Sequence, residues 1–148
     1  MTTYRERLLP NAGVMVLLLI GPAVLGVAYG AVIGAAAGWL VFAASALAVI
    51  VTIVLTSPLV SVDATGLTAG RARLPREAIG PTTVLNAGMR RTVLASQATA
   101  FTLLRTWHAP TAVQVDVLDA EDPHPSWVVT TRHPDRLVAA MDALRTSP

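Results

Sequence analysis

The side chains of this chain that could do acid–base or metal chemistry are few and scattered. The three histidines, His108, His124 and His133, include no pair at the i, i+4 spacing that places two metal ligands on one helix face. The densest polar cluster, residues 119–124 (DAEDPH), contains a proline and is typical of a solvated loop, not of carboxylates converging on a cation. We expect separate surface or capping roles for the histidines and no metal site.

Nucleophilic catalysis has no stronger candidate. The chain has no cysteine, and Ser96 and Ser126 lack both a glycine elbow and a neighbouring histidine that would activate the hydroxyl. Gly66 and Gly70 are assigned to turns, so no glycine-rich phosphate loop follows a predicted strand. The sequence therefore predicts a protein that is not an enzyme and that holds no cofactor.

The basic residues suggest a binding role. All eleven are arginine, the formal net charge is only +2, and they are not interleaved with aromatic residues, so we expect no nucleic-acid partner. The best candidates for contact with anionic lipid headgroups are Arg71, Arg73 and Arg76, together with Arg90 and Arg91. The alternative, which we favour, is that these arginines only set membrane topology and solvate one face of a strand.

The arginines at 71–76 follow a long apolar run that decides the fold class. From Gly13 to Thr56, about 44 residues, the run contains no charged residue and no histidine. A single bilayer crossing needs roughly 20 apolar residues, so the run is long enough for two crossings. Its least bulky part, GAVIGAAAG at 30–38, predicts a turn between a helix over about 11–31 and a helix over about 38–56.

The charges around the apolar run predict its orientation. Arg5 and Arg7 precede the run, Arg71, Arg73 and Arg76 follow it, and the predicted turn carries no charge. By the positive-inside rule both ends lie in the cytoplasm, which agrees with two crossings of a bacterial inner (plasma) membrane. A cleavable signal peptide is the alternative, but a second apolar segment follows the first at once. Three aromatic residues are expected near the membrane interfaces: Tyr4, Tyr29 and Trp39.

Small residues on the apolar run suggest close helix packing. Glycine recurs at every fourth position, at Gly26, Gly30, Gly34 and Gly38. We expect Gly26 and Gly30 to form a smooth strip against Ser45 and Ala48 of the second helix; the alternative is a glycine-mediated contact between two copies of the chain. Neither predicted span contains an ionisable residue, so a transport pathway through the hairpin alone is not expected.

After Pro58 the apolar pattern alternates, as in half-buried strands. We therefore divide the chain into a transmembrane hairpin at 1–57 and a cytoplasmic domain at 58–148. The first β-hairpin of that domain places its apolar side chains on one face: Val60, Val62, Leu67, Ala69, Ala72 and Leu74. Further strands are predicted at 82–87, 99–107, 112–118 and 126–132. The last segment predicts a helix that begins at Pro134, with an apolar face of Leu137, Val138, Met141 and Leu144.

Two segments carry a resemblance to a known fold. VSVDATGLTAGRARLPREAIG (60–80) and WVVTTRHPDRLVAAMDAL (127–144) resemble the first hairpins and the last strand plus capping helix of bacterial pleckstrin-homology-like domains. Over nearly its full length the chain is similar to an actinobacterial family of two-helix membrane proteins of unknown function. The resemblance implies a two-helix membrane hairpin followed by a small α+β domain, an antiparallel pleckstrin-homology-like sheet or barrel with a C-terminal capping helix. It implies no activity.

These observations predict a non-enzymatic integral membrane protein that presents an interaction module in the cytoplasm. The module would bind a protein partner or anionic lipid headgroups. The alternative is an accessory subunit of a transporter or of a cell-envelope assembly complex, which would contact its partner through the helices.

Overall fold

The computed structural model describes residues 3–96, 100–105, 107–119 and 121–146. The chain divides into two compact units. One unit is the apolar segment Leu9–Ser57, and the other joins the residues before Leu9 to those from Pro58 onward. The N-terminal residues therefore belong with the β-rich unit, which differs from the single division at 57/58 expected from the sequence.

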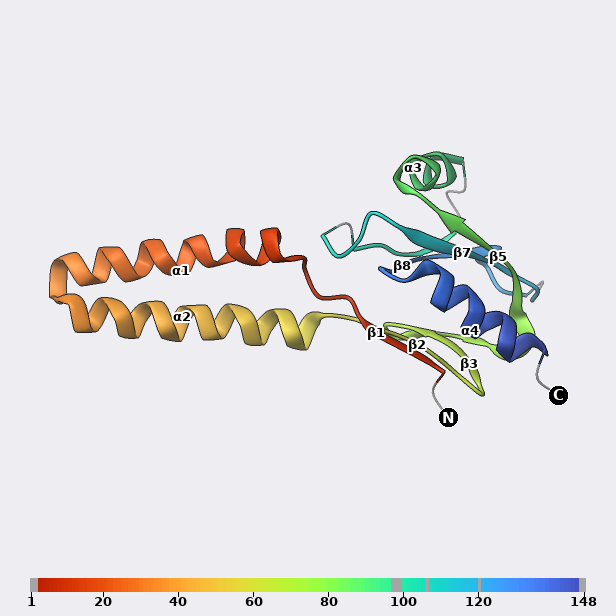
Figure 1. Cartoon of the computed structure of the whole chain (residues 1–148), viewed down its shortest axis with the longest axis horizontal. Helices are drawn as coiled ribbons and strands as arrows, with labels where there is room; N and C mark the ends of the chain where they lie inside the picture. The colour runs from red at the N-terminus through yellow and green to blue at the C-terminus, as the bar shows by residue number, and fades with distance from the viewer. Residues whose placement is uncertain (1–2, 97–99, 106, 120, 147–148) are drawn as a thin grey trace. The chain divides into compact units, whose positions relative to one another are not determined.

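The apolar segment forms two antiparallel helices, α1 (Ala12–Ile33) and α2 (Ala35–Thr56) (Figure 1). They are joined by Gly34 alone, whose φ of +123° is rarely adopted by residues with a Cβ. The turn expected over 30–38 is shorter than predicted, because the alanines that follow Gly34 are good helix formers and extend α2 towards its N-terminus. At the other end, the Asn11 side chain caps α1 by accepting the Val14 N–H at 3.0 Å.

The two helices contact each other through small residues. A Cβ placed on Gly26 would lie 2.9 Å from the Cβ of Phe42. A Cβ placed on Gly38 would lie 2.6 Å from the carbonyl oxygen of Gly26 and 2.8 Å from the Cα of Gly30. These distances are shorter than van der Waals contact, so the backbones are as close as only glycine permits.

The N-terminal strand lies beside the strand that follows the helices. The first sheet has the order β1-β2-β3-β4, and its antiparallel strands are Tyr4–Arg7, Leu59–Asp63, Gly66–Ala69 and Ala72–Pro75. Arg7 is opposite Leu59, and the Leu8 N–H donates to the Pro58 carbonyl at 3.0 Å. The chain therefore leaves this sheet at Leu8 and returns to it at Pro58, directly beside its point of departure.

The second sheet has the order β5-β7-β8-β6. Its strands are β5 (Ile79–Leu85), β6 (Phe101–Leu103), β7 (Ala112–Val117) and β8 (Ser126–Thr130). Strand β6 runs parallel to β8 and the other pairs are antiparallel. The 3₁₀ turn η1 (Arg76–Ala78) separates β4 from β5, and β5 pairs with β7. The described strands consequently form two sheets, not the closed barrel that the pleckstrin-homology resemblance allowed.

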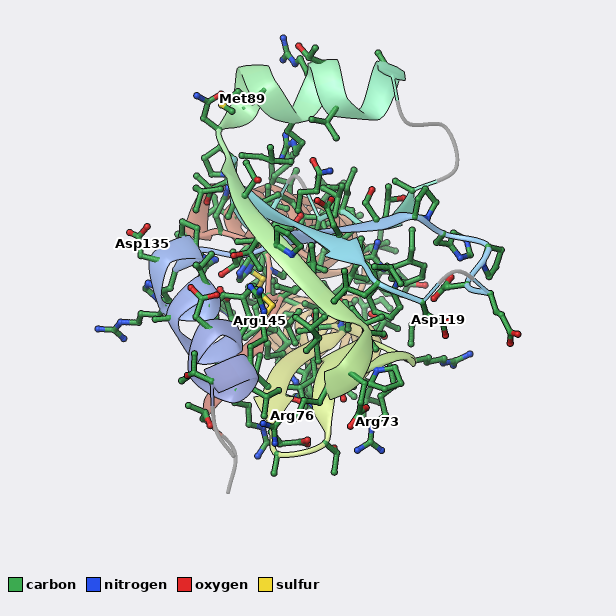
Figure 2. The ribbon with its side chains drawn as sticks, turned by 90° about the vertical axis from the view of Figure 1, so that its right-hand side faces the viewer. Arg73, Arg76, Met89, Asp119, Asp135 and Arg145 are labelled. Carbon is green, nitrogen blue, oxygen red and sulfur yellow. The ribbon has the colours of Figure 1, made fainter. Side chains whose placement is uncertain are left out.

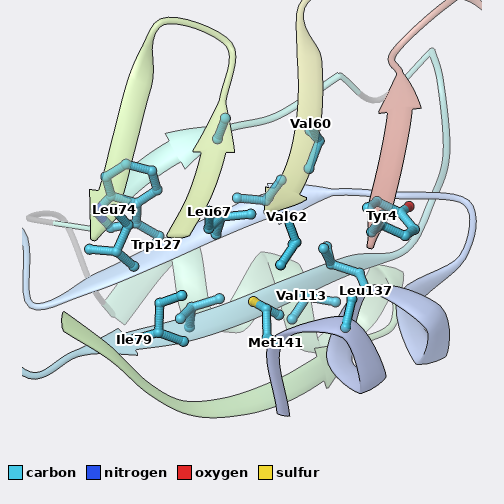
Figure 3. Packing of buried hydrophobic residues seen from close by; sticks show 14 of the residues in the cluster. Tyr4, Val60, Val62, Leu67, Leu74, Ile79, Val113, Trp127, Leu137 and Met141 are labelled. Carbon is cyan, nitrogen blue, oxygen red and sulfur yellow. The ribbon is translucent and has the colours of Figure 1, made fainter. Parts of the chain in front are cut away.

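One apolar core joins both sheets to the C-terminal helix α4 (Pro134–Thr146). Figure 3 shows Val62 and Leu67 from the first sheet, Val113 from the second, and Leu137 and Met141 from α4 meeting in this core. The predicted inward faces of the first hairpin and of α4 are thus confirmed. A smaller cluster on the second sheet consists of Leu85, Ala112 and Val128, with Val93 of the helix α3 (Ala87–Ser96) packed against it.

Helix α3 is the main departure from the predicted strand pattern. Asn86 accepts the Met89 N–H at 2.9 Å and caps the helix. The strand predicted at 82–87 therefore ends at Leu85, and of the strand predicted at 99–107 only Phe101–Leu103 is formed among the described residues; 99 and 106 lie outside them. The segment has a capping residue but a weak apolar period, which is why the helix was not predicted.

We predict that Gly38→Ala destabilises the helical hairpin by about 1–3 kcal/mol, because the new methyl group meets the backbone of α1 and the helices must separate. Gly21→Ala is the matched control, since a Cβ on Gly21 meets no neighbouring atom within 4 Å. The control should be neutral or stabilising by up to about 1 kcal/mol. Thermal unfolding of the full chain in detergent measures both, and equal midpoints for the two variants would contradict the packing described.

Candidate functional site

Of the four residues predicted to pack the two helices together, only the two glycines lie in the helix interface. Gly26 and Gly30 lie in the interface, but their nearest neighbours across it are Gly38 and Phe42. Ser45 is half-buried and donates its hydroxyl to the Val41 carbonyl at 2.6 Å, and Ala48 is exposed. The contact lies about two turns earlier in α2 than expected, because α2 begins at residue 35 and already includes Gly38.

The candidate lipid-binding arginines do not converge. Arg71 is exposed in the turn between β3 and β4. In that turn the Gly70 N–H donates to the Leu59 carbonyl at 2.7 Å, and a Cβ on Gly70 would lie 3.4 Å from the Cβ of Pro58. Arg71 therefore lies beside the point where the chain returns from α2 to the sheet.

Arg73 and Arg76 lie further along the same hairpin and point outward in Figure 2. Arg73 donates a hydrogen bond to the Thr65 hydroxyl, which donates to the Asp63 carboxylate. The hydrogen bond from the Thr65 side chain lowers the pKa of Asp63. Arg76 N–H donates to the Thr65 carbonyl at 3.2 Å, at the end of β4 opposite to the turn that holds Arg71. The hydrogen bonds that join Arg73, Thr65 and Asp63 therefore stabilise the β2–β3 turn.

Arg90 and Arg91 lie on α3 and differ in exposure. Arg90 is buried and donates to the Ala109 carbonyl at 3.3 Å, whereas Arg91 is exposed. Arg90 therefore holds α3 against the loop before β7. Of the five arginines considered from the sequence, Arg71, Arg73 and Arg91 are exposed, and Arg73 is engaged by Thr65.

A buried carboxylate on β1 is the most concentrated polar site in the described chain. Oε2 of Glu6 accepts hydrogen bonds from the Tyr4 hydroxyl and from the Thr131 hydroxyl, the latter at 2.7 Å. Oε1 accepts from His108 Nε2 at 2.6 Å and from the Arg132 N–H at 3.1 Å. The side chain of His108 is 1% exposed and that of Glu6 9% exposed, so both have little contact with solvent.

The hydrogen bonds decide the ionisation of this site. Burial acts to raise the pKa of Glu6, but the hydrogen bonds from its four donors outweigh burial and hold the pKa below its ordinary value. Burial, assisted by the hydrogen bond to Glu6, raises the pKa of the Tyr4 hydroxyl. Glu6 is therefore an ionised, acceptor-only group at neutral pH.

This site corrects two expectations. Tyr4 was expected at a membrane interface, but it is part of β1 and is buried in the core. His108 was expected at the surface or in a cap, but it is buried beside Glu6. The signal was present in YRER (4–7), where Tyr4 and Glu6 alternate with Arg5 and Arg7 as in a strand. Its partner strand comes more than fifty residues later, and no local pattern shows that pairing.

An open groove of about 660 Å³ lies along β1 and next to this site. Thr3 and residues 4–7 of β1 line one wall. The other wall includes Arg132 and His133, which precede α4, and Arg136, Ala139 and Ala140 of α4. Arg5, Arg7, Arg132 and Arg136 are all exposed. The groove therefore combines a strand edge, one helix face and four guanidinium groups, and it is the best candidate for a binding surface on the β-rich unit.

We predict that Glu6→Gln destabilises the β-rich unit by about 1–3 kcal/mol at pH 7, because an amide cannot accept from four donors and presents its own N–H groups to them. The folded-state pKa of Glu6 is lowered, so its stabilisation is complete above the ordinary glutamate value of about 4.3 and is lost as the pH falls through the lower, folded value. The stability difference between wild type and Glu6→Gln should shrink on acidification below that range.

Thermal unfolding of the full chain in detergent across pH 3–8 measures this difference, with the exposed Glu77→Gln as the matched control. Glu77→Gln should change the free energy of unfolding by no more than about 0.5 kcal/mol. A Glu6→Gln variant as stable as wild type at neutral pH would show that the cluster does not hold β1 in place.

Comparison with protein families matches residues 3–141 to the family described as a protein of unknown function, DUF3093. No curated protein and no solved structure matches the chain. The match begins one residue before β1 and ends in α4, so it covers the helical hairpin and both sheets. The chain belongs to the DUF3093 family.

Proposed function

We propose that this chain is a non-enzymatic integral membrane protein, in which α1 and α2 cross a bacterial inner membrane and anchor a cytoplasmic interaction module. The observation that carries the proposal is the surface of the two helices. Each has 22 residues, about 33 Å of helix, against a hydrocarbon core of roughly 30 Å. Only 11% of the most apolar window of each helix is buried, and Val32, Trp39 and Leu55 are more than 70% exposed. Lipid is the solvent that such a surface fits.

The pairing of β1 with β2 supports an even number of crossings. Arg7 and Leu59 are cross-strand partners, so the ends of the apolar segment begin from adjacent points of one sheet. A sheet cannot be divided by a bilayer, and both ends must therefore lie on the same side. Arg5 and Arg7 precede α1 and Arg71 lies beside Pro58 just after α2, so the positive-inside rule favours the cytoplasm for that side.

The same connectivity makes Arg71 the best of the three predicted arginines for contact with an anionic headgroup. Its turn lies beside Pro58, two residues after the end of α2, so in the proposed arrangement the turn is close to the bilayer surface. Arg76 lies at the far end of the strand, roughly 10 Å further along it.

We also propose that the order of strands followed by a C-terminal helix on the core reflects a pleckstrin-homology-like ancestry of the module.

The proposed topology predicts which positions are accessible from outside the cell. Single-cysteine variants measure this accessibility one position at a time, because the chain has no native cysteine. Ala36→Cys, next to the turn at Gly34, should react with an impermeant maleimide in intact cells. Thr3→Cys and Thr146→Cys should react only after the inner membrane is permeabilised. Alkaline carbonate should leave the protein in the membrane pellet. Release into the supernatant would contradict the anchor, and labelling of residues 3 and 146 from outside would contradict the orientation.

The second candidate is an accessory subunit that contacts a membrane partner through its helices. An apolar groove of about 450 Å³ on the hairpin favours it, because the groove is lined by small residues together with Trp39 and Phe42 and could receive an apolar side chain or helix of a partner. Replacing residues 9–57 with an unrelated two-helix anchor distinguishes the candidates by in-cell crosslinking. We expect the partner of the β-rich unit to be retained, whereas its loss on this exchange would favour the subunit.

A further inference from the structure

Strand β1 has a free edge among the described strands, because it is the outermost strand of the first sheet. The Leu8 N–H donates to the Pro58 carbonyl, and Glu6 lies opposite Val60 in the same ladder. Backbone groups alternate in direction along an antiparallel strand, so those of Tyr4, Glu6 and Leu8 point towards β2. The N–H and C=O groups of Arg5 and Arg7 therefore point away from β2, towards the edge.

The groove described above lies along this edge. Its second wall contains His133, Arg136 and Ala140 of the α4 region, which recur every three to four residues on one face of the helix. Ala139 and Ala140 are small, so this wall leaves space beside the strand. A groove between a strand edge and a helix suits an extended peptide, which gains backbone hydrogen bonds from the edge and side-chain contacts from the helix.

The charges around the groove select the kind of peptide. Arg5, Arg7 and Arg136 have exposed side chains, and Arg132 lines the groove although its Nε also donates to the His108 carbonyl at 3.2 Å. The one carboxylate in the lining, Glu6, already accepts four hydrogen bonds. Cross-strand neighbours lie about 5 Å apart, so acidic side chains on an added strand would pair directly with Arg5 and Arg7.

We propose that this groove binds an extended acidic segment of a partner protein, which adds a strand to the free edge of β1 and packs against α4. This inference rests on the proposed role of the β-rich unit as an interaction module and names its binding site. A second copy of the chain is a poorer occupant, because antiparallel pairing of two β1 edges would place arginines opposite arginines.

The test uses the full chain in detergent and a fluorescein-labelled peptide, GEVETEVEG, with fluorescence anisotropy as the readout. The double variant Arg5→Gln/Arg136→Gln should bind at least about tenfold more weakly than wild type, because two charge-assisted contacts are lost. The control Arg91→Gln/Arg145→Gln removes the same charge from exposed positions outside the groove and should bind within about twofold of wild type. A peptide with glutamine in place of glutamate should not bind.

Backbone pairing is tested separately from charge. Arg5→Pro removes an N–H that points to the free edge and leaves the β1–β2 ladder intact, whereas Arg5→Gln removes only the charge. Arg5→Pro should bind at least about tenfold more weakly than Arg5→Gln, since strand addition needs that donor. Ala139→Trp, which fills the groove from the helix side, gives an independent variant should Arg5→Pro unfold; it should also abolish binding.

The outcomes separate this inference from the proposed function. Absence of saturable binding, equal loss in both arginine double variants, or full binding by Ala139→Trp overturns the inference. Binding of wild type to phosphatidylglycerol vesicles that is lost in Arg5→Gln/Arg136→Gln, without peptide binding, overturns it in favour of a lipid. A partner crosslinked in cells to the β-rich unit in wild type and equally in the groove variants overturns the inference and leaves the interaction module intact.

Discussion

The pairing of β1 with β2 is the interaction on which the rest of this chain depends. It joins residues on either side of a segment with no charged residue, and so it makes the helical hairpin an insertion in a sheet. Bringing together two strands separated by such a long segment costs conformational entropy, which the helices reduce because they are joined by a single residue and return the chain to its starting point.

The hydrogen bonds of Glu6 also hold β1 in place, because they connect it to segments outside the first sheet. An ionised carboxylate is costly to bury without partners, and here the donors come from β1 itself, from the loop at His108 and from the segment that leads into α4. The site thus links the first residues of the described chain to its last helix. The same hydrogen bonds lower the pKa of Glu6, so the carboxylate is an ionised acceptor that connects these segments.

The arginines of the β-rich unit differ in whether the fold uses their side chains. Arg73 and Arg90 are occupied by hydrogen bonds within the fold, whereas Arg5, Arg7 and Arg136 surround a groove. The spacing of arginines along the sequence was a poor guide to this arrangement. Arg71, Arg73 and Arg76 are close in sequence but are spread along the β3–β4 hairpin from its turn to its far end. The arginines that line the groove come instead from the N-terminal strand and from the region of the C-terminal helix.

The sequence by itself determined the apolar hairpin, the first β-hairpin, strand β7 and helix α4, because each shows its burial as a local period or as an unbroken apolar run. It did not determine that residues 4–7 form a strand, that Asn86 begins a helix, or that Gly38 belongs to the helix interface. Those outcomes depend on partners distant in the sequence or on a turn of one residue, and only the tertiary structure supplies them. The groove has the same origin, since its walls come from β1 and from the α4 region, which are far apart in the sequence and are brought together by the shared core.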